Sequence, residues 1–98
     1  METKNLISIQ QFCSHYNIPK SFIDSLYDYE LIEIVFEDNE HYLRLTQINE
    51  VEKMMRLHYE LDINLEGVDA IYNLLKQVDS LKKEITLLQN KLRFYRDL

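Results

Sequence analysis

Apolar residues recur every seven positions through the last third of the chain. They form two interleaved series offset by three residues, which are the a and d positions of four heptads. A helix with this pattern presents one continuous apolar stripe, and a chain of 98 residues has no surface of its own long enough to cover it. The sequence therefore predicts a homodimer formed by a coiled coil, with an interface that contains Ile71, Leu74, Val78, Leu81, Ile85, Leu88, Leu92 and Tyr95.

The long helix is predicted to run from Asn64, whose side chain can cap the first turn, to Arg96. At about 1.5 Å per residue it is roughly 50 Å long. The charges beside the stripe favour an antiparallel pair. In a parallel pair Lys91 would face Arg96 of the second copy, whereas in an antiparallel pair Glu84 can meet Lys91.

The first part of the chain predicts two short helices joined by a brief turn. With one Gly and one Pro in the whole chain, tight turns are few and most of the chain is expected to be helical. After a short strand in the apolar segment NLISI, Ser8 can cap a helix over residues 9–16. Pro19 suits the start of a second helix, over residues 21–29, and the pair forms a helix-turn-helix.

A β-hairpin is predicted next, because apolar and polar residues alternate over residues 31–45 around a polar Asp-Asn turn. A hairpin in this position is a wing. A third helix follows over residues 46–61, with Thr46 as its candidate cap. The expected fold is therefore mostly α: a winged helix-turn-helix head with its connecting helix over residues 1–62, then a long dimerisation helix over residues 63–98.

Negative charge is concentrated in the head. Residues 1–45 hold eight acidic and three basic residues, a net charge of −5, whereas residues 46–98 hold nine acidic and eight basic residues, a net charge of −1. DNA phosphates attract Lys and Arg, so this head is poorly suited to nucleic acid and better suited to a basic protein surface. The predicted partner-binding residues are Asp24, Asp28, Glu30 and Glu33, the wing-tip residues Glu37, Asp38 and Glu40, and the aromatic anchors Tyr27 and Tyr29. The plainer alternative is a solvated helix face.

Catalytic and metal-binding signals are missing from the sequence. The three histidines lie on different predicted elements, without other ligands at metal-binding spacing, and the single cysteine, Cys13, lies on the apolar face of the first helix. No phosphate-binding loop or nucleophile–base pair is recognisable. We therefore expect neither an enzyme nor a cofactor. With no signal-peptide pattern and no long apolar run, we expect a cytoplasmic protein that does not enter membranes.

The layout resembles the MerR-like DNA-binding domains. Within them, the segments SIQQFCSHYNI, LIEIVF and MRLHYELDINLEGVDAIYNLLKQVDSLKKEI look like the CbpM family of chaperone modulators. That resemblance implies a protein that binds the J-domain of a DnaJ-like co-chaperone, CbpA, and blocks its stimulation of the chaperone DnaK. Such a J-domain carries a basic helix beside its His-Pro-Asp loop, to which an acidic head is electrostatically matched.

One departure from the family pattern concerns two turns in which the family often has Gly or another small residue. This chain has Asn17 and Glu30 there, and a positive φ suits Asn better than Glu. The sequence thus favours a CbpM-type regulator. A MerR-like DNA-binding transcriptional regulator is the main alternative, and an acidic scaffold or toxin-system partner is a third.

Overall fold

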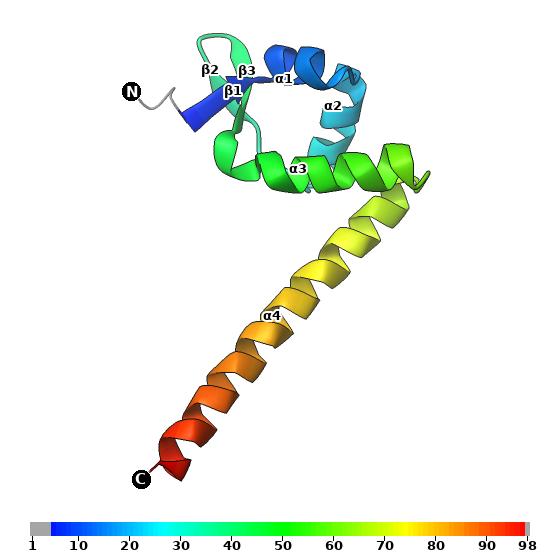
Figure 1. Ribbon diagram of the computed structural model, residues 1–98. Coiled ribbons are helices and arrows are strands. Elements are labelled where there is room, and N and C mark those ends of the chain that lie inside the picture. The colour runs from blue at the N-terminus through cyan, green and yellow to red at the C-terminus, as the bar shows by residue number, and fades with distance from the viewer. Residues whose placement is uncertain (1–4, 98) are drawn as a thin grey trace.

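The computed structural model describes residues 5–97 as a small head from which one long helix extends (Figure 1). Glu2 and Lys4, which the head's charge count includes, lie outside the described residues. The molecule measures 59 × 38 × 20 Å along its principal axes. In chain order the elements are β1 (Leu6–Ser8), α1 (Ile9–Tyr16), α2 (Lys20–Asp28), β2 (Val35–Glu37), β3 (Glu40–Arg44), the 3₁₀ turn η2 (Leu45–Gln47), α3 (Ile48–Met55), the π-helical segment η3 (Arg56–Glu60) and α4 (Leu65–Arg96).

The helix-turn-helix is confirmed, and local chemistry sets its limits. The hydroxyl oxygen of Ser8 accepts a hydrogen bond from the Gln11 amide at 3.0 Å, which caps α1 as predicted. Asn17 ends α1 with φ of 58°. Pro19 lies one position before α2, as its N-cap, so α2 begins and ends one residue earlier than predicted.

The wing is confirmed and gains a third strand. β2 and β3 pair antiparallel, and β1 pairs with the other edge of β3, which gives the strand order β1-β3-β2. Asp38 and Asn39 join β2 to β3 with φ of 50° and 62°. Two consecutive residues with positive φ define a type I′ turn, which matches the twist of paired strands and fixes their register.

The third helix differs from its prediction in composition and in its cap. Thr46 lies inside η2 and caps nothing, since α3 begins at Ile48 with Gln47 as an N-cap that makes no side-chain bond. The chain continues from α3 into η3 without a break, and the amide of Leu61 donates to the Arg56 carbonyl at 3.1 Å. The wider π turn therefore extends the predicted helix to Glu60.

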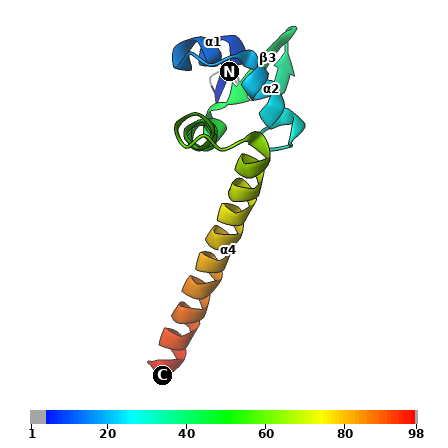
Figure 2. The same ribbon diagram turned by 90° about the vertical axis from the view of Figure 1, so that its right-hand side faces the viewer.

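The hydrophobic core lies between the helices and the sheet of the head. Phe12 and Ile9 from α1, Leu26 from α2 and Leu43 from β3 are almost wholly buried there. The core residues are Ile9, Phe12, Phe22, Ile23, Leu26, Leu31, Ile32, Leu43, Val51, Met54 and Val68. Val68 is the single fully buried residue of α4 among residues 65–97, so most of the long helix stands clear of the head, as Figure 2 shows.

The joint between the head and α4 is a short turn with several fixed contacts. His58 is hydrogen-bonded through Nδ1 to the carbonyl of Ile63 at 2.8 Å. The side chain of Asn64 accepts from the Gly67 amide at 2.8 Å and caps α4 as expected. A Cβ at Gly67 would lie 2.6 Å from Cγ2 of Ile63, so Gly67 makes room for its own N-terminal turn.

Candidate functional site: an acidic groove between α2 and the wing

The outer face of α2 carries the candidate partner-binding residues. Asp24, Tyr27 and Asp28 lie at positions separated by three and four residues, which places them on one side of the helix. The core residues of α2 occupy the other side. Lys20 approaches Asp24 at 3.4 Å, but both side chains are more than half exposed, so this pair offsets the negative charge only weakly.

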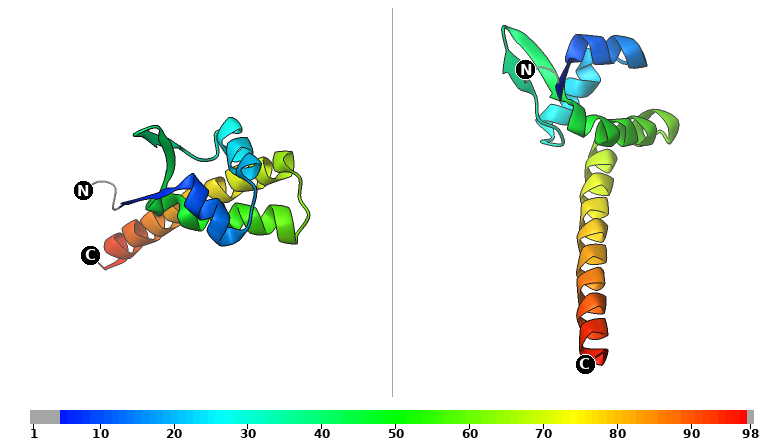
Figure 3. Two further views of the ribbon diagram at one scale, coloured as in Figure 1. Left: turned by 90° about the horizontal axis from the view of Figure 1, so that it is seen from above. Right: turned by 60° about the vertical axis from the view of Figure 1, so that its left-hand side comes forward.

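The hairpin stands beside this face and forms a groove with it. The groove has a volume of about 470 Å³ and is lined by Asp24, Tyr27, Asp28, Ile34, Phe36 and His41. Two of the lining aromatic side chains are strongly exposed, with Tyr27 at 51 % and Phe36 at 64 %. Figure 3 shows α2 and the hairpin as separate projections of the head. We call this feature the α2–wing groove.

Strand register explains which wing residues reach the groove. Phe36 lies directly opposite His41 in the β2–β3 pair, and their rings are 4.8 Å apart. Neither residue is among the partner-binding residues predicted from the sequence. The signal was present, because a two-residue turn at Asp38 and Asn39 dictates that Phe36 faces His41.

A second hollow of about 620 Å³ continues the groove along the segment between α2 and β2. Its lining comprises Tyr27, Asp28, Glu30, Ile32, Glu33 and Ile34. The backbone of Glu33 is held on both sides by Gln47, whose side-chain oxygen accepts from the Glu33 amide at 2.8 Å and whose side-chain amide donates to its carbonyl at 3.0 Å. The side chain of Glu33 stays 75 % exposed, 3.4 Å from Arg44. A fixed backbone and an exposed carboxylate are the features of a contact residue.

Glu30 has the backbone conformation that its residue type favours least, with φ of 60°. Its amide donates to the Tyr27 carbonyl at 2.9 Å, and the next amide, that of Leu31, donates to the Leu26 carbonyl at 2.9 Å. These two bonds form a Schellman motif, in which the positive-φ position is usually Gly. Asn17 ends α1 in the same way, with the Ile18 amide donating to the Cys13 carbonyl at 3.0 Å.

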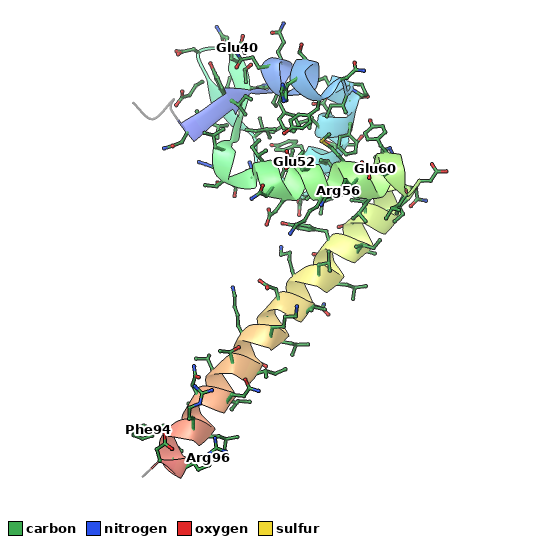
Figure 4. All side chains as sticks on the ribbon, viewed as in Figure 1. Glu40, Glu52, Arg56, Glu60, Phe94 and Arg96 are labelled. Atoms are coloured by element: carbon green, nitrogen blue, oxygen red, sulfur yellow. The ribbon has the colours of Figure 1, made fainter. Side chains whose placement is uncertain are left out.

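The remaining candidates lie at the wing tip and on the inner side of α2. Glu37 and Glu40 face each other across the end of the hairpin, with Asp38 in the turn between them; Figure 4 labels Glu40 at this end of the head. Tyr29 is placed differently, since it packs against the core instead of lining the groove. A hydrogen bond to the Glu66 carboxylate, more than burial, raises the pKa of the Tyr29 hydroxyl.

The predicted dimer residues form an uncovered stripe along α4. Seven of them, from Leu74 to Tyr95, are exposed by 45–68 %, and Ile71 is half-buried beside the head. Among residues 5–97 of the single chain, no element covers this stripe. Near the head α4 is tied to α3, because the Tyr72 hydroxyl donates to Glu50 at 3.0 Å. Burial, and then the Glu50 bond, raises the pKa of Tyr72 to about 12.

Two further features of the described residues concern metal binding and membrane insertion. Among residues 5–97, no group of three or more His, Cys, Asp or Glu side chains is arranged to hold a metal ion. None of the helices described there is both long and apolar enough to cross a bilayer.

A helix-turn-helix, a β-hairpin beside its second helix, and a long exposed terminal helix define a winged helix-turn-helix regulator. Comparison with protein families places it more closely: the chain belongs to the MerR HTH family of regulatory proteins, which it matches over residues 7–90. This confirms the MerR-like fold, and because the family is regulatory, it supports the expectation that the chain is not an enzyme. The closer resemblance to CbpM stays a prediction. No curated protein and no solved structure is significantly similar to this chain.

Proposed function

We propose that this MerR-family regulator acts through protein contact, by docking a basic protein surface in the α2–wing groove. The proposal rests on the negative charge of the face with which a winged helix-turn-helix meets DNA. The groove and its continuation hold Asp24, Asp28, Glu30 and Glu33, of which Asp24 is paired with Lys20 and Glu33 with Arg44. A phosphate backbone is repelled by such a face.

The groove also has the composition of a protein-binding site. Two exposed aromatic side chains, Tyr27 and Phe36, line it together with the carboxylates of Asp24 and Asp28. Protein interfaces concentrate binding energy in such aromatic residues, while rim charges steer the encounter. In line with the resemblance to CbpM, we propose the J-domain of a DnaJ-like co-chaperone as the partner. By covering the basic helix of the J-domain, the head would compete with DnaK and inhibit its stimulation.

We further propose that the working form is a homodimer joined through α4. The exposed stripe is regular over four heptads, as a two-stranded coiled coil requires. An antiparallel arrangement lets Glu84 of one copy approach Lys91 of the other, and it sends the two heads to opposite ends of the pair.

DNA-binding transcriptional regulation is the second candidate, and family membership favours it, because the matched family is described as a helix-turn-helix regulatory family. The two candidates make opposite predictions for charge reversal in the groove. Replacing carboxylates with Lys weakens docking of a basic protein and strengthens binding to duplex DNA.

The test measures both affinities by fluorescence anisotropy at low salt, with a labelled J-domain from a DnaJ-like protein and a labelled generic duplex. For Asp24→Lys plus Asp28→Lys we expect J-domain affinity to fall about tenfold or more, because two favourable rim charges become repulsive. Wild-type binding should also weaken as salt approaches about 0.1 M, where charges are screened beyond roughly 10 Å.

The matched control is Asp79→Lys plus Asp97→Lys, which changes the net charge equally on α4, away from the groove. This variant should retain J-domain affinity. If wild type fails to bind the J-domain at low salt but binds duplex DNA, the second candidate replaces the first. If both double variants weaken J-domain binding equally, the effect is one of net charge and the groove is not the docking site.

A further inference from the structure

The last three turns of α4 carry a second exposed apolar face, separate from the dimer stripe. Leu87 and Phe94 are exposed by 62 % and 61 %, yet neither occupies an a or d position of the heptads. They lie seven residues apart, both at position c, which is turned about 100° around the helix from position d. A two-stranded coiled coil through the a and d positions leaves this face uncovered.

The flanking charges of this face are basic. Lys83 and Lys91 lie four residues on either side of Leu87, so the sequence Lys-Leu-Lys-Phe follows one side of the helix at residues 83, 87, 91 and 94. We call these four residues the tail face. Lys83 is loosely paired with Asp79 at 3.7 Å, with both side chains at least 70 % exposed. Figure 4 shows Phe94 and Arg96 on different sides of the last turn, so Arg96 belongs to another face.

The chemical complement of the tail face lies on the head of the same chain. In the α2–wing groove an exposed aromatic residue, Tyr27, lines the groove together with Asp24 and Asp28. On the tail face a cation, Lys91, lies between Leu87 and Phe94 along the helix. The two surfaces therefore carry opposite charges, and each also exposes apolar side chains.

The two surfaces cannot meet within one molecule. Leu87 lies 22 residues beyond Leu65, the first residue of a continuous helix, and is therefore about 33 Å from the head along a rigid rod. The arrangement also differs from the coiled coil, because Leu87 and Phe94 lie off the dimer stripe. The groove of one molecule must therefore receive the tail face of another molecule.

We propose that the α2–wing groove binds the tail face of a second copy of this chain, so that self-association regulates access to the groove. A groove-to-tail contact is heterologous, and repeated contacts of this kind extend into open assemblies instead of closing. A basic partner that enters the groove displaces the tail face and shortens the assembly. This inference rests on the proposed function, because it assigns the same groove to basic surfaces.

The test is sedimentation velocity of the full chain over a range of concentrations at low salt. We expect the weight-average mass of wild type to rise with concentration to at least about twice that of Lys83→Glu, which should remain at the size of the coiled-coil unit; Lys91 is left unchanged because it meets Glu84 in the proposed coiled coil. The matched control, Lys82→Glu, changes the same charge on another side of α4 and should associate like wild type.

Charge exchange provides the second arm. Asp24→Lys plus Asp28→Lys should also block association, and adding Lys83→Glu in the same chain should partly restore it, because every reversed groove then meets a reversed tail face. A single size for wild type at every concentration overturns the inference, as does an equal loss in the control variant or a combined variant that stays apart. J-domain binding without self-association defeats this inference alone. Charge-dependent self-association without J-domain binding defeats only the proposed partner.

Discussion

The strained turn at Glu30 yields a prediction with a defined sign and size. Glu30 occupies the position of a Schellman motif that requires positive φ, and it has φ of 60°. For a residue with a Cβ atom this conformation costs about 1–2 kcal/mol. Glycine removes that cost, but it also makes the unfolded chain more flexible, which lowers the free energy of unfolding by about 0.4–1 kcal/mol. Glu30→Gly should therefore stabilise the head by about 1 kcal/mol.

The assay is thermal unfolding followed by circular dichroism at one protein concentration, because the stability of an oligomer depends on concentration. In a domain of this size, about 1 kcal/mol raises the melting temperature by about 4–8 °C. Glu30→Gln is the matched control, since it removes the charge and keeps the side-chain size and the backbone strain. It should melt within about 1 °C of wild type, because an exposed charge contributes little.

Measuring partner affinity beside stability distinguishes the backbone strain at Glu30 from a role of its carboxylate in binding. Both Glu30 variants lose a carboxylate from the hollow beside the α2–wing groove, so both should bind a basic partner less tightly. Only Glu30→Gly should gain stability. A Gly variant that melts no higher than the Gln variant would refute the reasoning that the backbone of Glu30 stores strain.

Three further predictions concern the joint and α4. Gly67→Ala should destabilise the protein by about 1 kcal/mol, although Ala is the better helix former, because its Cβ would lie 2.6 Å from Ile63. Ser80→Ala on the exposed helix is the control, and a Gly67→Ala variant more stable than wild type would contradict the packing argument. Tyr72→Phe should lower stability by about 1 kcal/mol through loss of the 3.0 Å bond to Glu50. The pKa of the Tyr72 hydroxyl is raised to about 12, so the stability that this hydroxyl contributes is complete below pH about 10 and is lost as pH rises toward 12. Tyr72→Phe should therefore reduce the alkaline loss of stability seen by chemical denaturation. Leu81→Asp should convert the proposed dimer to monomer in sedimentation, whereas Ser80→Asp, off the stripe, should not; a monomeric wild type would remove the coiled-coil interpretation.

Elements whose signals are local were predictable from the sequence. Ser8 and Asn64 marked two helix starts correctly because a capping side chain acts on amides within its own turn. The heptad pattern likewise predicted α4 almost to the residue, since helical periodicity accumulates over many turns. Thr46 was predicted wrongly as a cap because the chain passes through a 3₁₀ turn there before α3 begins.

Features that depend on how elements pack were not predictable in the same way. The candidate acids were chosen by charge, but the groove exists only because the core seats α2 beside the hairpin, which brings Phe36 and His41 to its wall. The same packing turns Tyr29 inward, toward Glu66. The π turn η3 was not predicted either, since the third helix was expected to run regularly to residue 61, whereas Arg56–Glu60 adopt the wider bonding pattern.

Several local rules of stability are broken on α2, in the turn that ends it and at the wing tip, and these are the places where the sequence predicts partner-binding residues. Glu30 adopts the left-handed conformation, Glu37 and Glu40 face each other across the hairpin end, and Asp24 and Asp28 share one side of α2. Like charges at these spacings cost a few tenths of a kcal/mol each, and the strain at Glu30 costs more. Proteins tend to retain such violations where function requires them. A basic partner would relieve the repulsions together, so the same residues that weaken the isolated head would strengthen the complex.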